Sequence, residues 1–376
     1  MRLSWVALLL IVLGSSWSFA TPPKKQTKLT LVKLSFLEAL APKDTTSSAR
    51  FEKDYLAALD IGKRLNKRKL AQCGYELESN TFFYDASDPL QAKEHAESAV
   101  KNGAWLLVGP RRSNHYLLLV KGAESTPTVS LLASSSEVEA LGKLHLSLSP
   151  TNSVMAKSAA IEISIRLKKI GANKTYISVV SEDCLSCKDF ANAFDREAKK
   201  LGLKKVDDLK ITGDFPETSA IVASIRTKKP AFVLLPNYSK TTSHVMSAVE
   251  GSGQNPLFVG GDGWGDSKFG FVQNADHNHE VEGFTVRGMP PVEQGLKKLS
   301  IYKDLPKTEM PSSGSALGIL KSLEATVEFL CKSKPKTSTD FKKSFEKQGS
   351  KLFASPWGVS IFDLNGGNIT YTRSTQ

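Results

Sequence analysis

The chain has 376 residues, and its 50 lysines and arginines against 38 aspartates and glutamates give a formal net charge of +12. Hydrophobic residues make up 40% of it and aromatic residues 8%, which excludes disorder along the whole chain. Four cysteines are too few for a disulfide scaffold, and the length suggests about two domains. The lysines are scattered singly or in pairs and no basic block is interleaved with aromatic residues, so we do not expect a nucleic acid as partner.

The first twenty residues have the pattern of a secretory signal peptide. Arg2 precedes the apolar run 6–13, which is too short to span a bilayer, and small residues lead to a cleavage site after Ala20. An uncleaved membrane anchor is the alternative. We therefore interpret residues 1–20 as a signal peptide and expect a soluble, exported protein.

Strands and helices alternate along the rest of the chain. This alternation predicts βαβ units with parallel sheets, and because the rhythm restarts after Pro150, we expect an α/β protein with two doubly wound, Rossmann-like lobes. In chain order, the expected elements are a strand at 29–36, a helix at 48–67, a strand at 73–83, a helix at 89–102, a strand at 104–108, a helix at 113–123, a strand at 128–132, a helix at 154–170, a strand at 175–180, a helix at 188–201, a strand at 206–211, a helix at 218–227, a strand at 232–235, a helix at 242–252, strands at 257–260 and 283–287, helices at 313–332 and 338–347, and a hairpin of 359–364 with 369–372.

Catalytic motifs are absent from the sequence. It contains no G-x-S-x-G elbow, no P-loop and no G-x-G-x-x-G after a strand, so we expect neither an enzyme nor a bound cofactor. His277 and His279, beside Asp276 and Glu280, form a metal-like cluster. Two residues apart in a polar loop, such ligands rarely converge on one ion, and we expect no metal there.

The four cysteines fall into two groups. Cys184 and Cys187 lie at a strand-to-helix junction, where a local disulfide is the favoured interpretation and a redox role of an activated thiolate is the alternative. Cys73 and Cys331 lie on separate expected elements, and the sequence does not say whether they pair.

Polar residues follow the carboxyl ends of four expected strands. They occupy residues 109–114, 131–136, 236–239 and 260–266. Serines and glycines are common in any turn, but ligands of open α/β sheets bind beyond these strand ends. Together the four turns therefore predict a cleft between the two lobes.

Three of these stretches resemble motifs of a known family. Residues 84–92 (YDASDPLQA) are similar to its Asp–Pro–Ala stretch before the second helix, and residues 107–109 (LVG) to the strand before its first ligand-contacting serine. Residues 258–264 (FVGGDGW) are similar to its late turn with an acidic ligand residue. With the leader, the two lobes and the terminal hairpin, residues 29–370 resemble periplasmic solute-binding proteins of the leucine/isoleucine/valine-binding type, which serve ABC importers.

The resemblance implies a type I periplasmic binding-protein fold with a multi-strand hinge. Lobe 1 would comprise residues 28–148 and 286–352, and lobe 2 residues 149–285 and 353–376. The implied function is non-enzymatic: a periplasmic monomer captures an amino acid or similar small carboxylate by hinge closure and delivers it to a membrane permease. A cell-envelope sensor or scaffold that uses the same fold to engage a protein partner is the alternative.

The resemblance also implies roles for individual residues. The Ser113 hydroxyl, with Ala133 and Ser134, would hold the ligand carboxylate on lobe 1. Tyr238 would reach in from lobe 2, and Asp262 would pair with the ligand ammonium, because a buried ammonium needs an anion.

Two positions depart from the family pattern. Ser186 stands where the family usually has an aromatic residue. The pair of Arg111 and Arg112 is unusual in the first-lobe turn; we expect one of them to face solvent and consider Arg112 as a contact to an acidic group of the ligand.

Overall fold

The computed structural model describes residues 29–40, 46–264, 281–366 and 368–375. The expected signal peptide at 1–20 and the histidine cluster at 276–280 lie outside the described residues. Within these ranges, no helix has the length and apolar character to cross a membrane. The same residues contain no group of three or more histidines, cysteines and carboxylates placed to hold a metal ion.

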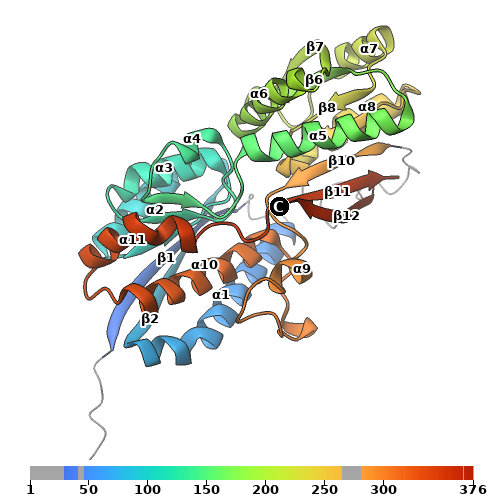
Figure 1. The fold of residues 1–376 in the computed structure, drawn as a ribbon. Coiled ribbons are helices and arrows are strands. Elements are labelled where there is room, and N and C mark those ends of the chain that lie inside the picture. Colours follow the sequence, from blue (N-terminus) through green and yellow to red (C-terminus); the bar gives the residue numbers. More distant parts are fainter. Residues whose placement is uncertain (1–28, 41–45, 265–280, 367, 376) are drawn as a thin grey trace, which may run out of the picture.

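The first of two sheets contains five parallel strands in the order β2-β1-β3-β4-β5 (Figure 1). Its strands are β1 (Thr30–Leu40), β2 (Tyr75–Asp85), β3 (Leu106–Val108), β4 (Thr128–Ser130) and β5 (His145–Ser147). The accompanying helices are α1 (Thr46–Cys73), α2 (Leu90–Lys101), α3 (Ser113–Ala123), α4 (Ser136–Glu139), α9 (Val292–Leu296), α10 (Gly314–Ser333) and α11 (Ser338–Leu352).

The second sheet has the order β12-β11-β10-β9-β8-β6-β7. Strands β6 to β10 are parallel, and β11 and β12 add an antiparallel hairpin at one edge. Its strands are β6 (Thr175–Ser181), β7 (Lys204–Ile211), β8 (Phe232–Leu234), β9 (Leu257–Gly260), β10 (Glu282–Arg287), β11 (Val359–Asn365) and β12 (Asn368–Thr375). Its helices are α5 (Asn152–Ile170), α6 (Leu185–Lys200), α7 (Ser219–Lys228) and α8 (Ser239–Gly251). The prediction of an α/β protein with two doubly wound lobes is confirmed.

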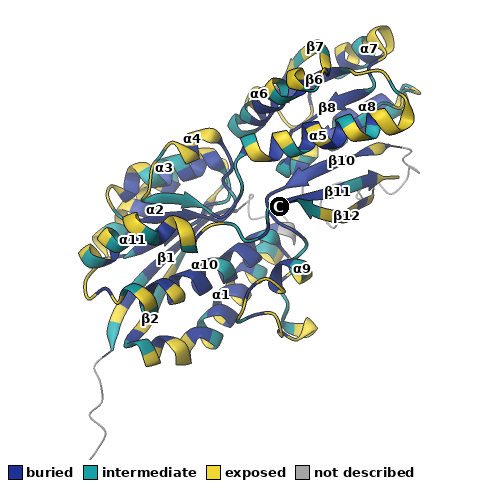
Figure 2. Ribbon diagram, in the orientation of Figure 1, coloured by how far each residue is buried: buried dark blue, intermediate teal, exposed yellow. Residues whose placement is uncertain are grey.

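Each sheet carries an apolar core on both of its faces. In β1, Leu34 and Phe36 belong to the core beneath α1 and α10, whereas Leu37 and Ala39 belong to the core beneath α2 and α3. This division follows from the pleat, which turns successive side chains to opposite faces. Figure 2 shows the result as strands buried between helices whose outer faces are exposed. A strand buried on both faces reads as a continuous apolar run, which is why the central strands were predictable.

The chain passes between the two lobes three times (Figure 1). The connections are β5 to α5, β10 to α9, and α11 to β11. Three separate segments of the chain therefore connect the lobes.

Both possible disulfides are present, and all four cysteines are paired. The expected local bridge joins Cys184 to Cys187. The pair that the sequence left open, Cys73 with Cys331, joins the end of α1 to α10 across a sequence separation of 258 residues. This second bridge ties the amino-terminal part of lobe 1 to the part that returns to it late in the chain.

The double substitution Cys73→Ser with Cys331→Ser should lower the free energy of unfolding by about 2–5 kcal/mol, because the bridge restricts a long loop of the unfolded chain. Urea denaturation followed by circular dichroism measures this loss. An unchanged midpoint would show that the bridge does not stabilise the fold.

Candidate functional site

A small pocket lies where the carboxyl ends of strands from both sheets meet. In the first sheet, β1 and β3 are neighbours, but the chain continues from β1 to β2 on one side and from β3 to β4 on the other. In the second sheet, the chain likewise continues from β6 to β7 on one side and from β8 to β9 on the other. Such switch points leave a crevice that open α/β sheets use for ligands. The pocket has a volume of about 80 Å³ and is lined by residues that follow β3, β6 and β8, namely Arg112, Ser113, Asn114, Asp183, Cys184, Leu185, Ser186 and Tyr238.

Gly109 fixes the turn that leads from β3 into the pocket. Its φ is +104°, and a Cβ at this position would lie 1.9 Å from the Leu37 carbonyl oxygen. Only glycine fits so close to the neighbouring strand with a positive φ. The tight turn lets α3 begin at Ser113, with Arg112 as its N-cap residue.

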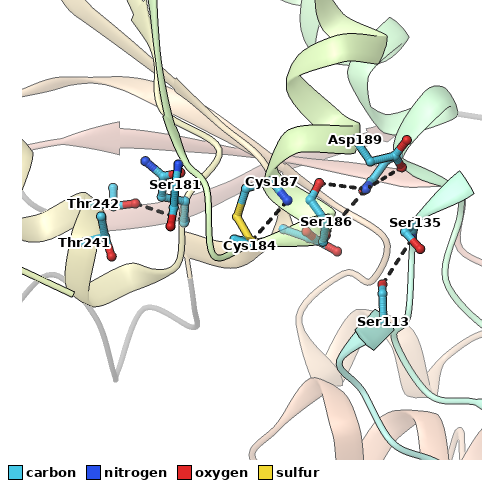
Figure 3. The surroundings of a disulfide bond; sticks show 12 residues. Ser113, Ser135, Ser181, Cys184, Ser186, Cys187, Asp189, Thr241 and Thr242 are labelled. Carbon is cyan, nitrogen blue, oxygen red and sulfur yellow. Dashed lines mark hydrogen bonds between the residues drawn. A yellow bond between two sulfur atoms is a disulfide. The ribbon is translucent and has the colours of Figure 1, made fainter. Parts of the chain in front are cut away.

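Ser113 is almost completely buried and ties this turn to the one after β4. Its Oγ accepts the backbone N–H groups of Ser134 and Ser135, both at 3.2 Å (Figure 3). Ala133 is held differently, because its N–H donates to Ser130 Oγ at 2.9 Å. In this conformation the Ala133 N–H is therefore engaged within lobe 1.

Asp262 reaches the cleft from the short helix η1 (Asp262–Trp264) after β9. Trp264 anchors this turn: its indole N–H donates to the Leu235 carbonyl oxygen at 2.7 Å, and its ring packs on Gly260, where a Cβ would lie 2.1 Å from it. Asp262 Oδ2 accepts a hydrogen bond from Ser134 Oγ at 2.9 Å, so the two predicted ligand groups bind each other across the cleft. Burial raises the pKa of Asp262, although the Ser134 hydroxyl and the positive charge of Arg287 oppose this rise.

Arg112 and Tyr238 form a second contact between the lobes. Tyr238 is the N-cap residue of α8, and the guanidinium carbon of Arg112 lies 5.6 Å from the centre of its ring. A guanidinium at this distance from a tyrosine ring forms a cation–π interaction.

Arg111 has a different environment within lobe 1. Its Nε lies 3.9 Å from Oε1 of Glu38, and its guanidinium lies 4.2 Å from the centre of the Phe51 ring. Glu38 is fully buried at the end of β1, and burial raises its pKa, while the charge of Arg111 opposes the shift. Sequence reasoning missed Glu38. The feature that could have identified it is an acidic residue within an otherwise apolar stretch of β1.

Asp189 makes a third contact between the lobes. It lies on α6 and accepts both the N–H of Ser136, at 2.8 Å, and the Ser136 hydroxyl, at 2.6 Å. Asn152, at the start of α5, donates to Asp189 Oδ2 and to the carbonyl oxygen of Ser186, both at 3.0 Å (Figure 3). The Cys184–Cys187 disulfide lies beside Ser186 and Asp189 (Figure 3). No local pattern predicts this network, because its members come from distant elements.

The seven predicted site residues thus lie at or next to one cleft, and they make three kinds of contact there. Arg112, Ser113, Ser186 and Tyr238 line the pocket, and Ser134 and Asp262 bond to one another across the cleft. Ala133 contributes to the turn that holds Ser134. The cleft is closed in this structure, and the hydroxyl of Ser134 and the carboxylate of Asp262 satisfy each other across it.

His115 lies behind the pocket, buried on α3. The Tyr84 hydroxyl is 3.2 Å from its Nδ1. Burial lowers the pKa of His115 to about 4, and the positive charges of Arg112 and Arg111 add to this effect. The folded protein therefore favours the neutral imidazole.

A lowered histidine pKa makes folding less favourable in acid. The stabilisation is complete above the unfolded pKa of 6.5 and is lost as the pH falls toward the folded value of about 4. His115→Gln should remove up to about 3 kcal/mol of this pH dependence, measured as free energies of unfolding between pH 7 and pH 4. His95→Gln is the matched control for loss of an imidazole from lobe 1. Parallel curves for wild type and His115→Gln would contradict the assignment.

Asp189→Ala should shift the ligand-free protein toward an open state. Hydrogen bonds to a carboxylate contribute about 1.5–3 kcal/mol, so the closed population should fall by roughly 10- to 100-fold relative to the open one. Small-angle X-ray scattering would record a larger radius of gyration. Asp304→Ala, an exposed residue of lobe 1, controls for the lost charge. A scattering profile equal to that of the control would show that Asp189 does not hold the lobes together.

No protein-family model and no curated protein matches the chain. Solved structures do match it. The isoleucine complex of LivJ, the branched-chain amino acid transporter substrate binding protein of Streptococcus pneumoniae, is 17% identical over 92% of this chain and 100% of that chain, with a TM-score of 0.71. The closed leucine-, isoleucine-, valine-, threonine- and alanine-binding protein of Brucella ovis is 16% identical over 91% and 94%, with a TM-score of 0.71. A solute binding protein of an ABC transporter from R. palustris, in complex with benzoate, is 15% identical over 91% and 96%, with a TM-score of 0.65. These likenesses establish the fold, which is the predicted type I periplasmic binding-protein fold.

Proposed function

We propose that this protein is a non-enzymatic solute-binding protein for an amino acid or similar small carboxylate. The observation that carries the proposal is the pocket at the switch points of both sheets, with Ser113 on one lobe and Asp262 reaching the same cleft from the other. The structural neighbours support it, since their ligands include isoleucine and benzoate.

The described residues provide for both ends of an amino acid. Helices α3, α6 and α8 begin at the pocket, with Arg112, Cys184 and Tyr238 as their N-cap residues. Helix N-termini attract a carboxylate through their free N–H groups and their dipoles. Asp262 supplies the opposite charge for an ammonium group.

Ligand entry requires the lobes to open. The pocket of about 80 Å³ has roughly half the volume of an apolar cavity that holds benzene. An incoming amino acid would replace the Ser134–Asp262 bond with its own ammonium, and closure would re-form the contact of Ser136 with Asp189.

The cellular setting is part of the proposal. We assign residues 1–20 to export into the periplasm, lobe 1 to residues 28–148 and 286–352, and lobe 2 to residues 149–285 and 353–376. The closed monomer would then deliver its ligand to the permease of an ABC importer.

A sensor or scaffold with a protein partner is the second candidate. The bond between Ser134 and Asp262 favours it, because two groups of the cleft are occupied with each other. Such a protein would use the lobes as a surface and would not respond to small solutes.

A thermal-shift screen of protein refolded from denaturant separates the two candidates. The panel comprises amino acids, dicarboxylates, short amides and small aromatic acids. A ligand at 100 times its dissociation constant should stabilise the protein by about 2.7 kcal/mol. A flat panel would contradict the solute-binding function and favour the scaffold.

Asp262→Asn should abolish the response to amino acids and leave the ligand-free melting temperature equal or higher at pH 7. The raised pKa of Asp262 means that folding disfavours its charge, so removing that charge costs the ligand-free protein nothing. Asp304→Asn is the control. Undiminished affinity in Asp262→Asn would overturn the ammonium assignment.

A further inference from the structure

Two neighbouring arginines follow β3, and among the described residues only Arg111 has a carboxylate partner. Arg111 lies 3.9 Å from the buried carboxylate of Glu38 and stacks on Phe51 within the same lobe. Its charge is compensated inside lobe 1 whatever the cleft contains. Arg111 is therefore a structural residue of this lobe.

Arg112 faces the pocket and lacks such compensation. Among the described residues, no carboxylate lies within ion-pair distance of its guanidinium, whose close partner is the ring of Tyr238 on the other lobe. Arg112 is half-buried in the closed protein. A charge that loses part of its water on closure is costly unless an anion accompanies it.

The rest of the pocket also favours an anion. Ser113 is 3% exposed and lines the pocket; its Oγ accepts two N–H groups, so its proton has no acceptor among the described residues. The one acidic side chain of the lining, Asp183, is exposed and accepts the N–H of Gly213 at 2.9 Å. Within the described part of the chain, the pocket thus contains a cation without a carboxylate partner and a buried hydroxyl whose proton has no acceptor.

We propose that Arg112 determines specificity by binding a second acidic group of the ligand, so that the substrate class is the acidic amino acids. This inference rests on the proposed function. The ligand α-carboxylate and ammonium would engage Ser113 and Asp262, and the side-chain carboxylate would form a bidentate pair with the Arg112 guanidinium. The second carboxylate balances the charge that a neutral side chain would leave unpaired.

Isothermal titration of refolded protein with L-glutamate and L-glutamine tests this pairing, because the two ligands have nearly the same shape and differ in one charge. L-Aspartate and L-asparagine form a second pair. Each acid should bind at least about tenfold more tightly than its amide, as expected for a charge-assisted bidentate contact. In Arg112→Gln, affinity for the acid should fall by about 10- to 100-fold, while affinity for the amide stays within about threefold.

Two further variants complete the design. Arg226→Gln removes the same charge from an exposed position on α7 and should keep the wild-type ratio of acid to amide. Arg112→Lys keeps the charge but loses the planar fork, and its ratio should lie between those of wild type and Arg112→Gln.

The outcomes separate this inference from the function on which it rests. If wild type binds the amides or leucine as tightly as the acids, the solute-binding function holds and the role of Arg112 is overturned. Equal losses for acid and amide in Arg112→Gln would show that Arg112 only closes the lobes against Tyr238, which also overturns it. If no amino acid or carboxylate binds, the proposed function itself fails, and this inference fails with it.

Discussion

Carboxylates within a closing cleft must find hydrogen-bond donors, and the arrangement of the two lobes depends on this constraint. Asp262 and Asp189 project from lobe 2, and both accept hydrogen bonds from serines of lobe 1. Because burial penalises an unpaired carboxylate, closure over the buried Asp262 is favoured in the geometry that brings Ser134 into reach, whereas the more exposed Asp189 adds its bonds to Ser136. The apolar cores hold each lobe together, whereas these few polar contacts determine how the lobes meet.

The same contacts would affect the affinity for any ligand that binds in the cleft. In the proposed function, a ligand ammonium at Asp262 would gain an ion pair but displace the hydroxyl of Ser134, so its affinity would reflect the difference between the two interactions. Asp189 lies outside the pocket and binds Ser136 of lobe 1 in the closed protein. In the proposed function, one carboxylate would therefore recognise the ligand while the other stabilises the closed state.

Sequence reasoning predicted the two lobes and most elements, because buried parallel strands such as β3 and β8 are continuous apolar runs between amphipathic helices. It missed β5, because its three residues are too few to show a strand periodicity. They form a strand through pairing with the edge of β4. The polar turns that meet at the cleft were also identified, since strand ends of a parallel sheet converge. Asp189 and Glu38 were missed for opposite reasons: the former acts through contacts across the lobes, and the latter is hidden within a strand. The pairing of Cys73 with Cys331 depends on how α1 packs against α10, which no local pattern encodes.

The two arginines after β3 show why local sequence cannot assign their roles. Both stand in the same turn, and Gly109 directs both toward the carboxyl end of the sheet. What separates them is the buried carboxylate at the end of β1, which pairs with Arg111 and leaves Arg112 to the cleft. Without Glu38, two cations would face one pocket and repel each other as the lobes close. With it, Arg112 is the one basic residue of the described pocket lining, and in the proposed function its position relative to Ser113 and Asp262 would decide which side chains the pocket accepts.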